Sequence, residues 1–352
     1  MSSDIKKILA EKKPMIDKII EKWVPREYDE KSLAKTCGPG NYDTDAANKA
    51  VSEPVWDMLD RGGKRWRPVL MLLIIEALGK DPKEFLDFVA IPELIHNGTL
   101  MIDDIEDDSE LRRGKPCTHK KFGTDIAVNT GNAMYYLPMQ IVLKSNLNVE
   151  KKTRIYETYI QEMINISFGQ GFDIAWHRGL ANADSITEAE YLQMCAFKTG
   201  TLARMAAKLG AILADADKTT TEKIGRFAES IGVAFQIQDD ILNIQPTKEW
   251  GKEIGDDINE GKRTLMVIHT LKKANEQDKK RLIEILNMHT KDTKLIKEAI
   301  DIIKKYDSIN YAKTFASDIV KKAWVDIDEL LPKSEAKENL GAFADFLVER
   351  GI

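Results

Sequence analysis

A run of carboxylates lies between Asp103 and Glu110, where six of the eight side chains are acidic, and two arginines follow directly. Like charges four residues apart on a helix destabilise it mildly, so this segment needs a compensating positive charge. On an α-helix Asp103, Asp104 and Asp107 fall within one third of the circumference, and we expect them to face one way. Clustered carboxylates suit hard divalent cations, and Mg²⁺ in particular combines one or two carboxylates with waters and phosphate oxygens. The segment therefore predicts a magnesium site.

A second acidic pair repeats this pattern far along the chain. Residues 238–243 read QDDILN and echo residues 102–107, IDDIED, with a polar group four residues after the first aspartate in both copies. The simpler interpretation of one acidic run is a solvated helix face with weak ion pairs. Two copies, each after a long apolar segment, favour two halves of one metal site instead. The five histidines form no close pair in the sequence, so zinc is not indicated.

Basic residues beside chain breaks indicate a polyphosphate pocket. Arginine binds phosphate through two parallel hydrogen bonds, and a diphosphate bridged to magnesium needs cations on its outer oxygens. Taken singly, each such residue is more often an ordinary surface cation. Taken together, they favour a phosphate-binding role, and the candidates are Lys64, Arg65, Arg67, Arg112, Arg113, Lys198, Lys252 and Lys262.

The elements that must position these groups are predicted to be helices. Apolar residues recur at helical spacing, and strand-like alternation is almost absent. Thr187 with Glu190, and Thr219 with Glu222, match capping boxes at helix starts, and Pro92 favours a helix start at its own position. Turn residues predict breaks at 37–41, 61–63, 112–116, 179–184, 245–251 and 332. We predict an all-α fold and one domain over residues 1–352, in which 1–45 form an N-terminal helical segment.

Composition excludes several classes of protein. The chain has 352 residues, of which 43% are hydrophobic and 31% charged, and its net charge of −5 gives no basic field for nucleic acid. Three distant cysteines indicate reduced thiols in a cytoplasmic protein. The longest apolar run, at 69–75, is far shorter than the roughly 20 residues of a membrane-spanning helix. We expect a soluble protein that does not span a membrane.

Six segments resemble the trans-isoprenyl diphosphate synthase family. They are GGKRWRP at 62–68, ELIHNGTLMIDDIEDDSELRRGKP at 93–116, GQGFDIAW at 169–176, KTG at 198–200, FQIQDDILN at 235–243 and GKEIGDDINEGKRT at 251–264. Their details look closest to geranylgeranyl diphosphate synthases of the eukaryotic type, which tend to share the asparagine found at Asn243. The resemblance implies a helical bundle around a deep central cavity, a homodimer, and head-to-tail condensation of isopentenyl diphosphate with allylic diphosphates.

The resemblance also assigns residues to roles. Three Mg²⁺ ions per active site are implied, held by Asp103, Asp107 and Asp239. Isopentenyl diphosphate is assigned to Lys64, Arg67, His96 and Arg113. The allylic diphosphate is assigned to Arg112, Lys198, Thr199, Gln236, Lys252 and Lys262. The residues assigned to the reacting centre are Lys198, Gln236 and Asp173, with Gln170 beside them.

Product length depends on the residues one helical turn before Asp103. A turn of about 5.4 Å is close to one isoprene unit, and the small Gly98 and Thr99 leave room where short-chain relatives carry aromatic residues. We predict a C20 product, geranylgeranyl diphosphate, with Tyr135 as part of the cavity floor; core packing is the competing role of that tyrosine. The competing functions are synthesis of a C25 or longer product, synthesis of farnesyl diphosphate, a catalytically silent regulatory subunit and a class I terpene cyclase.

Overall fold

The structure, a computed structural model, describes residues 4–246 and 254–349. The described chain is mostly helical, as predicted, and the only strands in these two ranges are a two-residue antiparallel pair, β1 (Leu111–Arg112) and β2 (Lys115–Pro116). The chain divides into two compact units, residues 1–156 with 209–216 and residues 157–208 with 217–352. The prediction of one domain stays a prediction.

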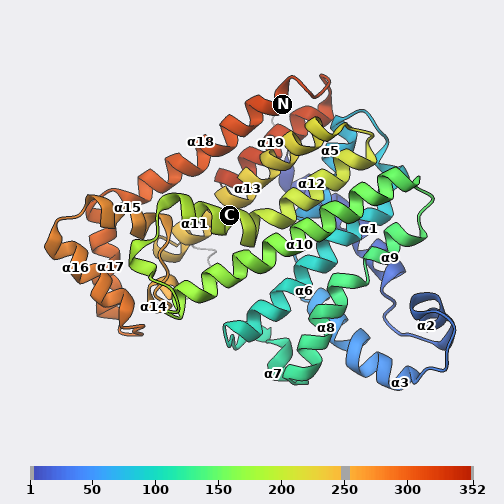
Figure 1. The fold of residues 1–352 in the computed structure, drawn as a ribbon, viewed down its shortest axis with the longest axis horizontal. Coiled ribbons are helices and arrows are strands. Elements are labelled where there is room, and N and C mark those ends of the chain that lie inside the picture. The colour runs from blue at the N-terminus through green and yellow to red at the C-terminus, as the bar shows by residue number, and fades with distance from the viewer. Residues whose placement is uncertain (1–3, 247–253, 350–352) are drawn as a thin grey trace. The chain divides into compact units, whose positions relative to one another are not determined.

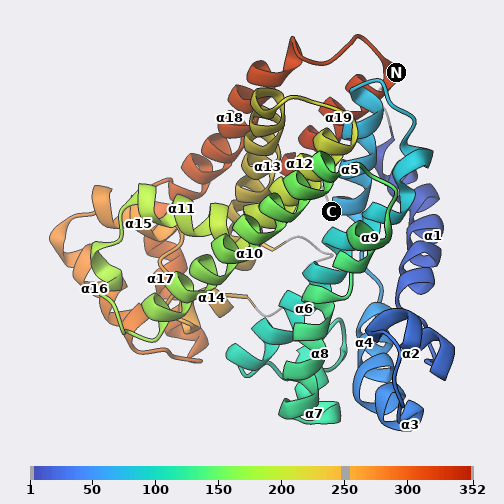
Figure 2. The same cartoon turned by 45° about the vertical axis from the view of Figure 1, so that its right-hand side comes forward.

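The first unit is built around a buried helix, α5 (Trp66–Ala77), in which every side chain except Glu76 is buried. A second core helix, α6 (Ala90–Glu106), packs against α5 and lies beside α8 in both ribbon views (Figures 1 and 2). The other elements of this unit are α1 (Ile5–Trp23), α2 (Glu30–Cys37), α3 (Thr44–Ala47), η1 (Asn48–Ser52), α4 (Glu53–Leu59), η2 (Pro82–Val89), α7 (Thr118–Phe122), α8 (Thr124–Tyr136) and α9 (Met139–Lys144).

The second unit is organised by a long helix pair, α13 (Lys218–Ile244) with α18 (Ser308–Asp328), which Figure 1 shows side by side. Phe227 of α13 meets Trp324 of α18 edge to face, with ring centroids 5.5 Å apart. The remaining elements here are η3 (Ala183–Ser185), α11 (Glu188–Cys195), η4 (Ala196–Gly200), α14 (Asp256–Asn259), α15 (Leu265–Lys273), α16 (Glu276–Asn287), α17 (Thr293–Lys305) and α19 (Glu335–Glu349). The unit boundary falls within α10 (Val149–His177) and α12 (Thr201–Leu213).

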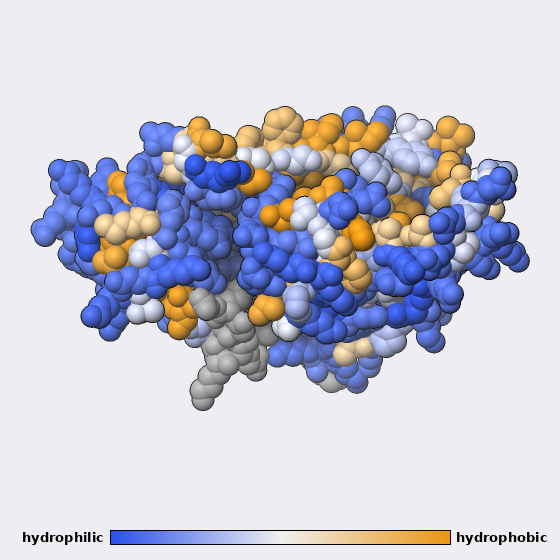
Figure 3. Space-filling view, turned by 90° about the horizontal axis from the view of Figure 1, so that it is seen from below, coloured by the Kyte–Doolittle hydropathy of each residue, from blue (hydrophilic) through white to orange (hydrophobic). Residues whose placement is uncertain are grey.

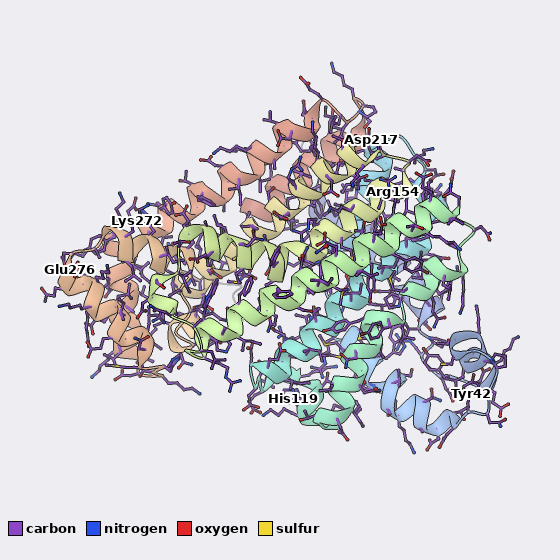
Figure 4. All side chains as sticks on the ribbon, viewed as in Figure 1. Tyr42, His119, Arg154, Asp217, Lys272 and Glu276 are labelled. Carbon is purple, nitrogen blue, oxygen red and sulfur yellow. The ribbon has the colours of Figure 1, made fainter. Side chains whose placement is uncertain are left out.

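Local capping explains most helix starts, with two differences from prediction. The Thr187–Glu190 capping box is confirmed at the start of α11. The one at Thr219 is wrong, because Asp217 caps α13 and accepts a hydrogen bond from the Thr220 amide; Figure 4 labels this aspartate. Aspartate at the earlier position offers the stronger acceptor. Helix α6 begins two residues before Pro92, since η2 runs directly into it.

One segment passes a length-and-composition test for a membrane-spanning helix. It comprises residues 82–106, which form η2 and α6, and 67% of its most apolar window is buried inside the structure. Burial of this kind is expected for a core helix. On the face seen in Figure 3 hydrophilic residues predominate, and hydrophobic residues gather in smaller patches, several of them along the upper edge.

Candidate active site

The first aspartate segment ends α6. Asp103 is half-buried, Asp107 is exposed and closes the helix as its C-cap, and Asp104 is almost fully buried. Asp104 accepts a hydrogen bond from Nε of Arg112 at 2.8 Å, and its other carboxylate oxygen is buried without a hydrogen-bond partner. Asp104 is therefore taken into the interior while Asp103 and Asp107 keep access to solvent, and the common direction of the three carboxylates stays an expectation.

Arg112 stands on the β hairpin that follows α6. Its Nη2 also lies 3.6 Å from an oxygen of Asp103, so one guanidinium spans both carboxylates of the pair. Arg61 holds the hairpin in place by donating to the backbone oxygens of Arg112 and Pro116 at 3.2 and 2.7 Å. The arginine predicted to hold the allylic diphosphate thus balances the acidic segment's charge in this structure.

Arg67 and Arg113, two of the residues predicted to hold isopentenyl diphosphate, lie close enough to His96 for their charges to act on it. Burial, and after it the charges of Arg67, Arg113 and two further arginines, lowers the pKa of His96 well below its ordinary value. Arg67 is buried and stacks over the Trp66 ring at 4.3 Å, and Arg113 donates to the backbone oxygen of Gly62. A neutral imidazole among guanidinium groups suits a multiply charged anion. Lys64, on the same segment as Arg67, is exposed.

The predicted chain-length residues lie where α6 crosses α8. A Cβ on Gly98 would come within 2.9 Å of the Gly131 backbone oxygen and 3.1 Å of the Tyr135 ring. The small size of Gly98 is therefore required for close helix packing. Thr99 is half-buried, and its hydroxyl donates to the His96 backbone oxygen at 2.8 Å. Of the two small residues, Thr99 is the one whose side chain can be enlarged without separating the helices.

In the second unit, the KTG segment forms the π-helical turn η4, which is held between two glycines. A Cβ on Gly169 of α10 would lie 2.6 Å from the Phe197 carbonyl carbon, and one on Gly232 of α13 would lie 2.6 Å from the Gly200 Cα. Contacts this short leave no room for a side chain, so both helices pass directly against the η4 backbone. Turns of this kind are rare and occur often at functional sites.

Lys198 of η4 lies in a charged cluster with two other predicted site residues. Its Nζ donates to Asp173 at 2.5 Å, and burial works to raise the pKa of Asp173 while the charges of Lys198 and Lys262 outweigh it and lower that pKa. Burial works to lower the pKa of Lys262. The negative charges of Asp257, Glu260 and Asp173 outweigh burial and hold this pKa well above its ordinary value. Lys262 is therefore fully protonated at neutral pH.

A chain of hydrogen bonds joins the neighbouring polar residues. The Thr199 hydroxyl donates to Oε1 of Gln236 at 2.8 Å, and Nε2 of Gln236 donates to Asp240 at 2.9 Å. Tyr191 of α11 donates to the other oxygen of Asp240 at 2.7 Å. Burial, followed by the charge of Asp257, raises the pKa of Asp240. Sequence reasoning missed Tyr191, because nothing in the sequence places it beside a residue of α13.

The second aspartate segment lies near the end of α13. Asp239 is half-buried, whereas Asp240 is buried. Asn243 is also buried and accepts a hydrogen bond from the Asp257 amide at 3.2 Å, so it holds the start of α14. Gln170 is half-buried on α10, and the predicted Lys252 lies outside the described residues. Within residues 4–246 and 254–349, no cluster of three or more His, Cys, Asp or Glu side chains could hold a metal ion unaided.

Comparisons with known proteins identify the chain's relatives. The sequence model of the family described as polyprenyl synthetase matches residues 48–303. A short chain isoprenyl diphosphate synthase of Methanothermobacter thermautotrophicus is 37% identical over 83% of this chain and 88% of the relative. A geranylfarnesyl diphosphate synthase of Natronomonas pharaonis is 33% identical over 83% of this chain and 88% of its own length.

Solved structures agree with these relatives. The crystal structure of a geranylgeranyl pyrophosphate synthetase from Pyrococcus horikoshii superposes with a TM-score of 0.85 and 32% identity, covering 99% of this chain and 98% of that one. The isoprenoid synthase fold predicted from the sequence is thereby confirmed. The proteins named here come from archaea, so the resemblance to a eukaryotic type finds no support in them.

Proposed function

Because the chain belongs to the polyprenyl synthetase family and is a trans-prenyltransferase, we propose that it condenses isopentenyl diphosphate with allylic diphosphates to make geranylgeranyl diphosphate. The observation that carries the assignment of substrates is the clustering of cations in each unit. His96 lies among four guanidinium groups in the first unit, and Lys198 and Lys262 flank Asp173 in the second. Each cluster offers the charge and the hydrogen-bond donors that a diphosphate requires.

Enzymes of this family use Mg²⁺ in catalysis, and the donor set fits that ion. Asp103, Asp107 and Asp239 provide oxygen ligands on half-buried or exposed side chains, and these three would hold three ions together with diphosphate oxygens. Bound Mg²⁺ would stabilise the negative charge that the diphosphate gains as its bond to the allylic carbon breaks. Arg112, already beside Asp103, would hold the same diphosphate.

The chain's own residues act on the leaving group and the acceptor. Lys198, Lys262 and Lys252 provide positive charge, and Thr199 and Gln236 orient the allylic diphosphate through their shared hydrogen bond. Lys198 is fixed by Asp173, so its charge needs little reorganisation when the C–O bond breaks. We assign Gln170 to the same centre on the resemblance of its segment to the family.

Lys64, Arg67, His96 and Arg113 hold isopentenyl diphosphate. The allylic C–O bond breaks, its electron pair leaves with the diphosphate, and the double bond of isopentenyl diphosphate attacks the allylic cation. The resulting tertiary cation then loses a proton, which the departed diphosphate takes up. This route needs no protein nucleophile, and the residues must instead keep water away from the cation.

A C20 product is supported by the crystal structure of similar fold, which is a geranylgeranyl pyrophosphate synthetase. The geranylfarnesyl diphosphate synthase among the relatives makes C25 the second candidate. Thr99 and Tyr135 are the side chains that we assign to the chain-length boundary, with Gly98 fixing the distance between α6 and α8.

A homodimer is supported by an apolar stripe on α10. Ile160, Ile164, Phe168 and Phe172 are spaced four residues apart, so they share one face of the helix, and all four are exposed. Large apolar side chains gathered on one helix face are typical of a protein interface. We propose that two copies bury this stripe, which sedimentation measurements of molar mass can test. A cytoplasmic location is supported by the three free cysteines.

The proposed function is tested by incubating the purified protein with Mg²⁺, labelled isopentenyl diphosphate and each of the C5, C10 and C15 allylic diphosphates. We expect C20 alcohols after dephosphorylation. A protein that turns over no primer would be the catalytically silent subunit, and cyclic products without incorporation of label would indicate a terpene cyclase.

A further inference from the structure

Arg65 has an uncommon backbone conformation at the start of α5. Its φ of 54° and ψ of 31° place it in the left-handed region, which costs free energy for a residue other than glycine. Lys64 precedes it directly and Arg67 follows two positions later. Such a conformation persists only when surrounding contacts hold it. The contacts of Arg65 therefore decide the geometry of the whole basic segment.

The guanidinium of Arg65 is buried and connects three parts of the first unit. Its Nε donates to Asp17 of α1 at 2.8 Å, and its Nη1 donates to Glu93 of α6 at 2.7 Å. The remaining donors reach the backbone oxygens of Leu59 and Gly62 at 3.2 and 3.3 Å. A planar guanidinium with five donors suits this junction, and a lysine at this position could not make all four contacts.

Both carboxylates that face Arg65 are themselves fixed. Glu93 is buried, accepts a hydrogen bond from Asn97 at 2.9 Å, and lies one turn before His96 on α6. Asp17 is followed on α1 by the buried Ile19 and Ile20, while its own side chain is 39% exposed. Helix α1 lies outside the part of the chain that the family model matches, residues 48–303. One of the two anchors of Arg65 thus comes from outside the matched segment.

We propose that Asp17 and Glu93 are positioning residues for isopentenyl diphosphate. They hold Arg65 in its left-handed conformation, and Arg65 in turn fixes Lys64 and Arg67 relative to His96. This inference rests on the proposed assignment of Lys64, Arg67 and His96 to that substrate. Its new content is that the N-terminal helix controls affinity for the acceptor substrate through one ion pair, without touching it.

Asp17→Asn is the decisive variant, because Asp17 is partly exposed and its loss leaves Arg65 paired with Glu93. Loss of a charged hydrogen bond reduces binding by roughly tenfold when it preorganises a site. We expect the KM for isopentenyl diphosphate to rise about tenfold, while kcat and the KM for the allylic substrate stay within about twofold. Asp17→Glu, which keeps the charge, should recover most of the affinity.

Asp87→Asn is the matched control. Asp87 pairs with Lys22 of α1 at 2.7 Å, so this variant also removes a partly exposed carboxylate that holds α1, but one without contact to Arg65. It should leave both KM values unchanged. Calorimetric titration of isopentenyl diphosphate into each protein, without metal or allylic substrate, measures the same affinity without turnover.

Equal KM values for isopentenyl diphosphate in wild type, Asp17→Asn and Asp87→Asn would overturn the inference. An equal rise in the KM values for both substrates would also overturn the inference, because it would indicate that the variant loosens the whole protein. If wild type itself neither binds nor uses isopentenyl diphosphate, the proposed function fails instead, and the two failures are thereby distinguished.

Discussion

The hydroxyl of Tyr191 donates a hydrogen bond to Oδ2 of Asp240 at 2.7 Å, and both side chains are buried. Burial and the charge of Asp240 raise the pKa of Tyr191, so the hydroxyl keeps its proton and remains a donor. The other oxygen of Asp240 receives the amide of Gln236, which fixes the orientation of that amide toward Thr199. The second aspartate of the pair therefore organises the polar residues of α13 and η4, and Asp239 is the member of the pair that we assign to the proposed metal.

Tyr191→Phe should weaken the hydrogen-bonded chain from Asp240 through Gln236 to Thr199 while the protein keeps its fold. Removing the donor leaves a buried carboxylate oxygen without a partner, which costs about 1–3 kcal/mol. We expect the KM for the allylic diphosphate to rise several-fold, and the KM for isopentenyl diphosphate to stay unchanged. Steady-state kinetics and urea unfolding measure both effects. Tyr306→Phe is the control, since it removes a tyrosine–aspartate hydrogen bond of the same 2.7 Å length at the end of α17; identical allylic KM values in the two variants would contradict the role of Tyr191.

Gly169→Ala should displace the backbone of η4 and, with it, the side chain of Lys198. Its Cβ would lie 2.6 Å from the Phe197 carbonyl carbon, so α10 and η4 must separate and Lys198 must move. Overpacking of this kind costs about 1–3 kcal/mol, and we expect a marked loss of kcat as well. Gly171→Ala, on the same helix with nothing within 4 Å of the new Cβ, should stabilise the protein by up to about 1 kcal/mol and retain activity. A similar outcome for both variants in thermal unfolding would refute the close crossing.

Thr99→Phe should shorten the product. The phenyl ring would extend from a half-buried position one turn before Asp103, where the growing chain is proposed to run. We expect C15 in place of C20 with the C5 primer, and turnover of that primer largely intact, as measured by chromatography of the dephosphorylated products. Leu100→Phe is the control, because its side chain points about 100° further around α6. If Thr99→Phe makes a product of unchanged length, the growing prenyl chain does not pass Thr99.

The pKa of His96 predicts how stability depends on pH. Burial and the surrounding arginines hold this pKa well below 6.5, so below that pH the unfolded chain binds a proton that the folded protein does not. The contribution of His96 to the free energy of unfolding is therefore fully present above the pKa of the unfolded chain. It decreases as the pH falls, by up to about 1.4 kcal/mol per pH unit for one such group. The free energy of unfolding of wild type relative to His96→Gln should decrease between pH 7.5 and 5. A constant difference across this range would contradict a neutral imidazole at His96.

The sequence alone predicted the all-helical fold class and the segments of the chain that carry the candidate site residues. Apolar periodicity and turn residues are local signals, and the Thr187 capping box was recoverable from four residues. The start of α13 was placed wrongly at Thr219, because Thr219 with Glu222 matches a capping box whereas the structure uses Asp217 as the cap. The π-helical turn at Lys198 had no local signal, because it depends on glycines of two other helices.

The residues that hold the site residues in place could not be predicted from the sequence either. Arg65 with Asp17, and Tyr191 with Asp240, are separated by 48 and 49 residues and carry ordinary residue types. Helical spacing also placed Asp104 beside Asp103 and Asp107, but it could not indicate that Arg112 would take this carboxylate into the interior. Spacing predicts which residues share a helix face, whereas partners from other elements decide which of them are buried.

The central claim is that Asp103 and Asp239 serve one magnesium-dependent ionisation of an allylic diphosphate. Single-turnover release of diphosphate from a labelled allylic substrate, with Mg²⁺ and isopentenyl diphosphate present, tests it most directly in wild type, Asp103→Asn, Asp239→Asn and the double variant. We predict that each single variant slows release by about 10³-fold or more, and that the double variant is little slower than either, as for groups that act as a unit. Release at the wild-type rate in either single variant, or in wild type after chelation of all divalent metal, would contradict the account.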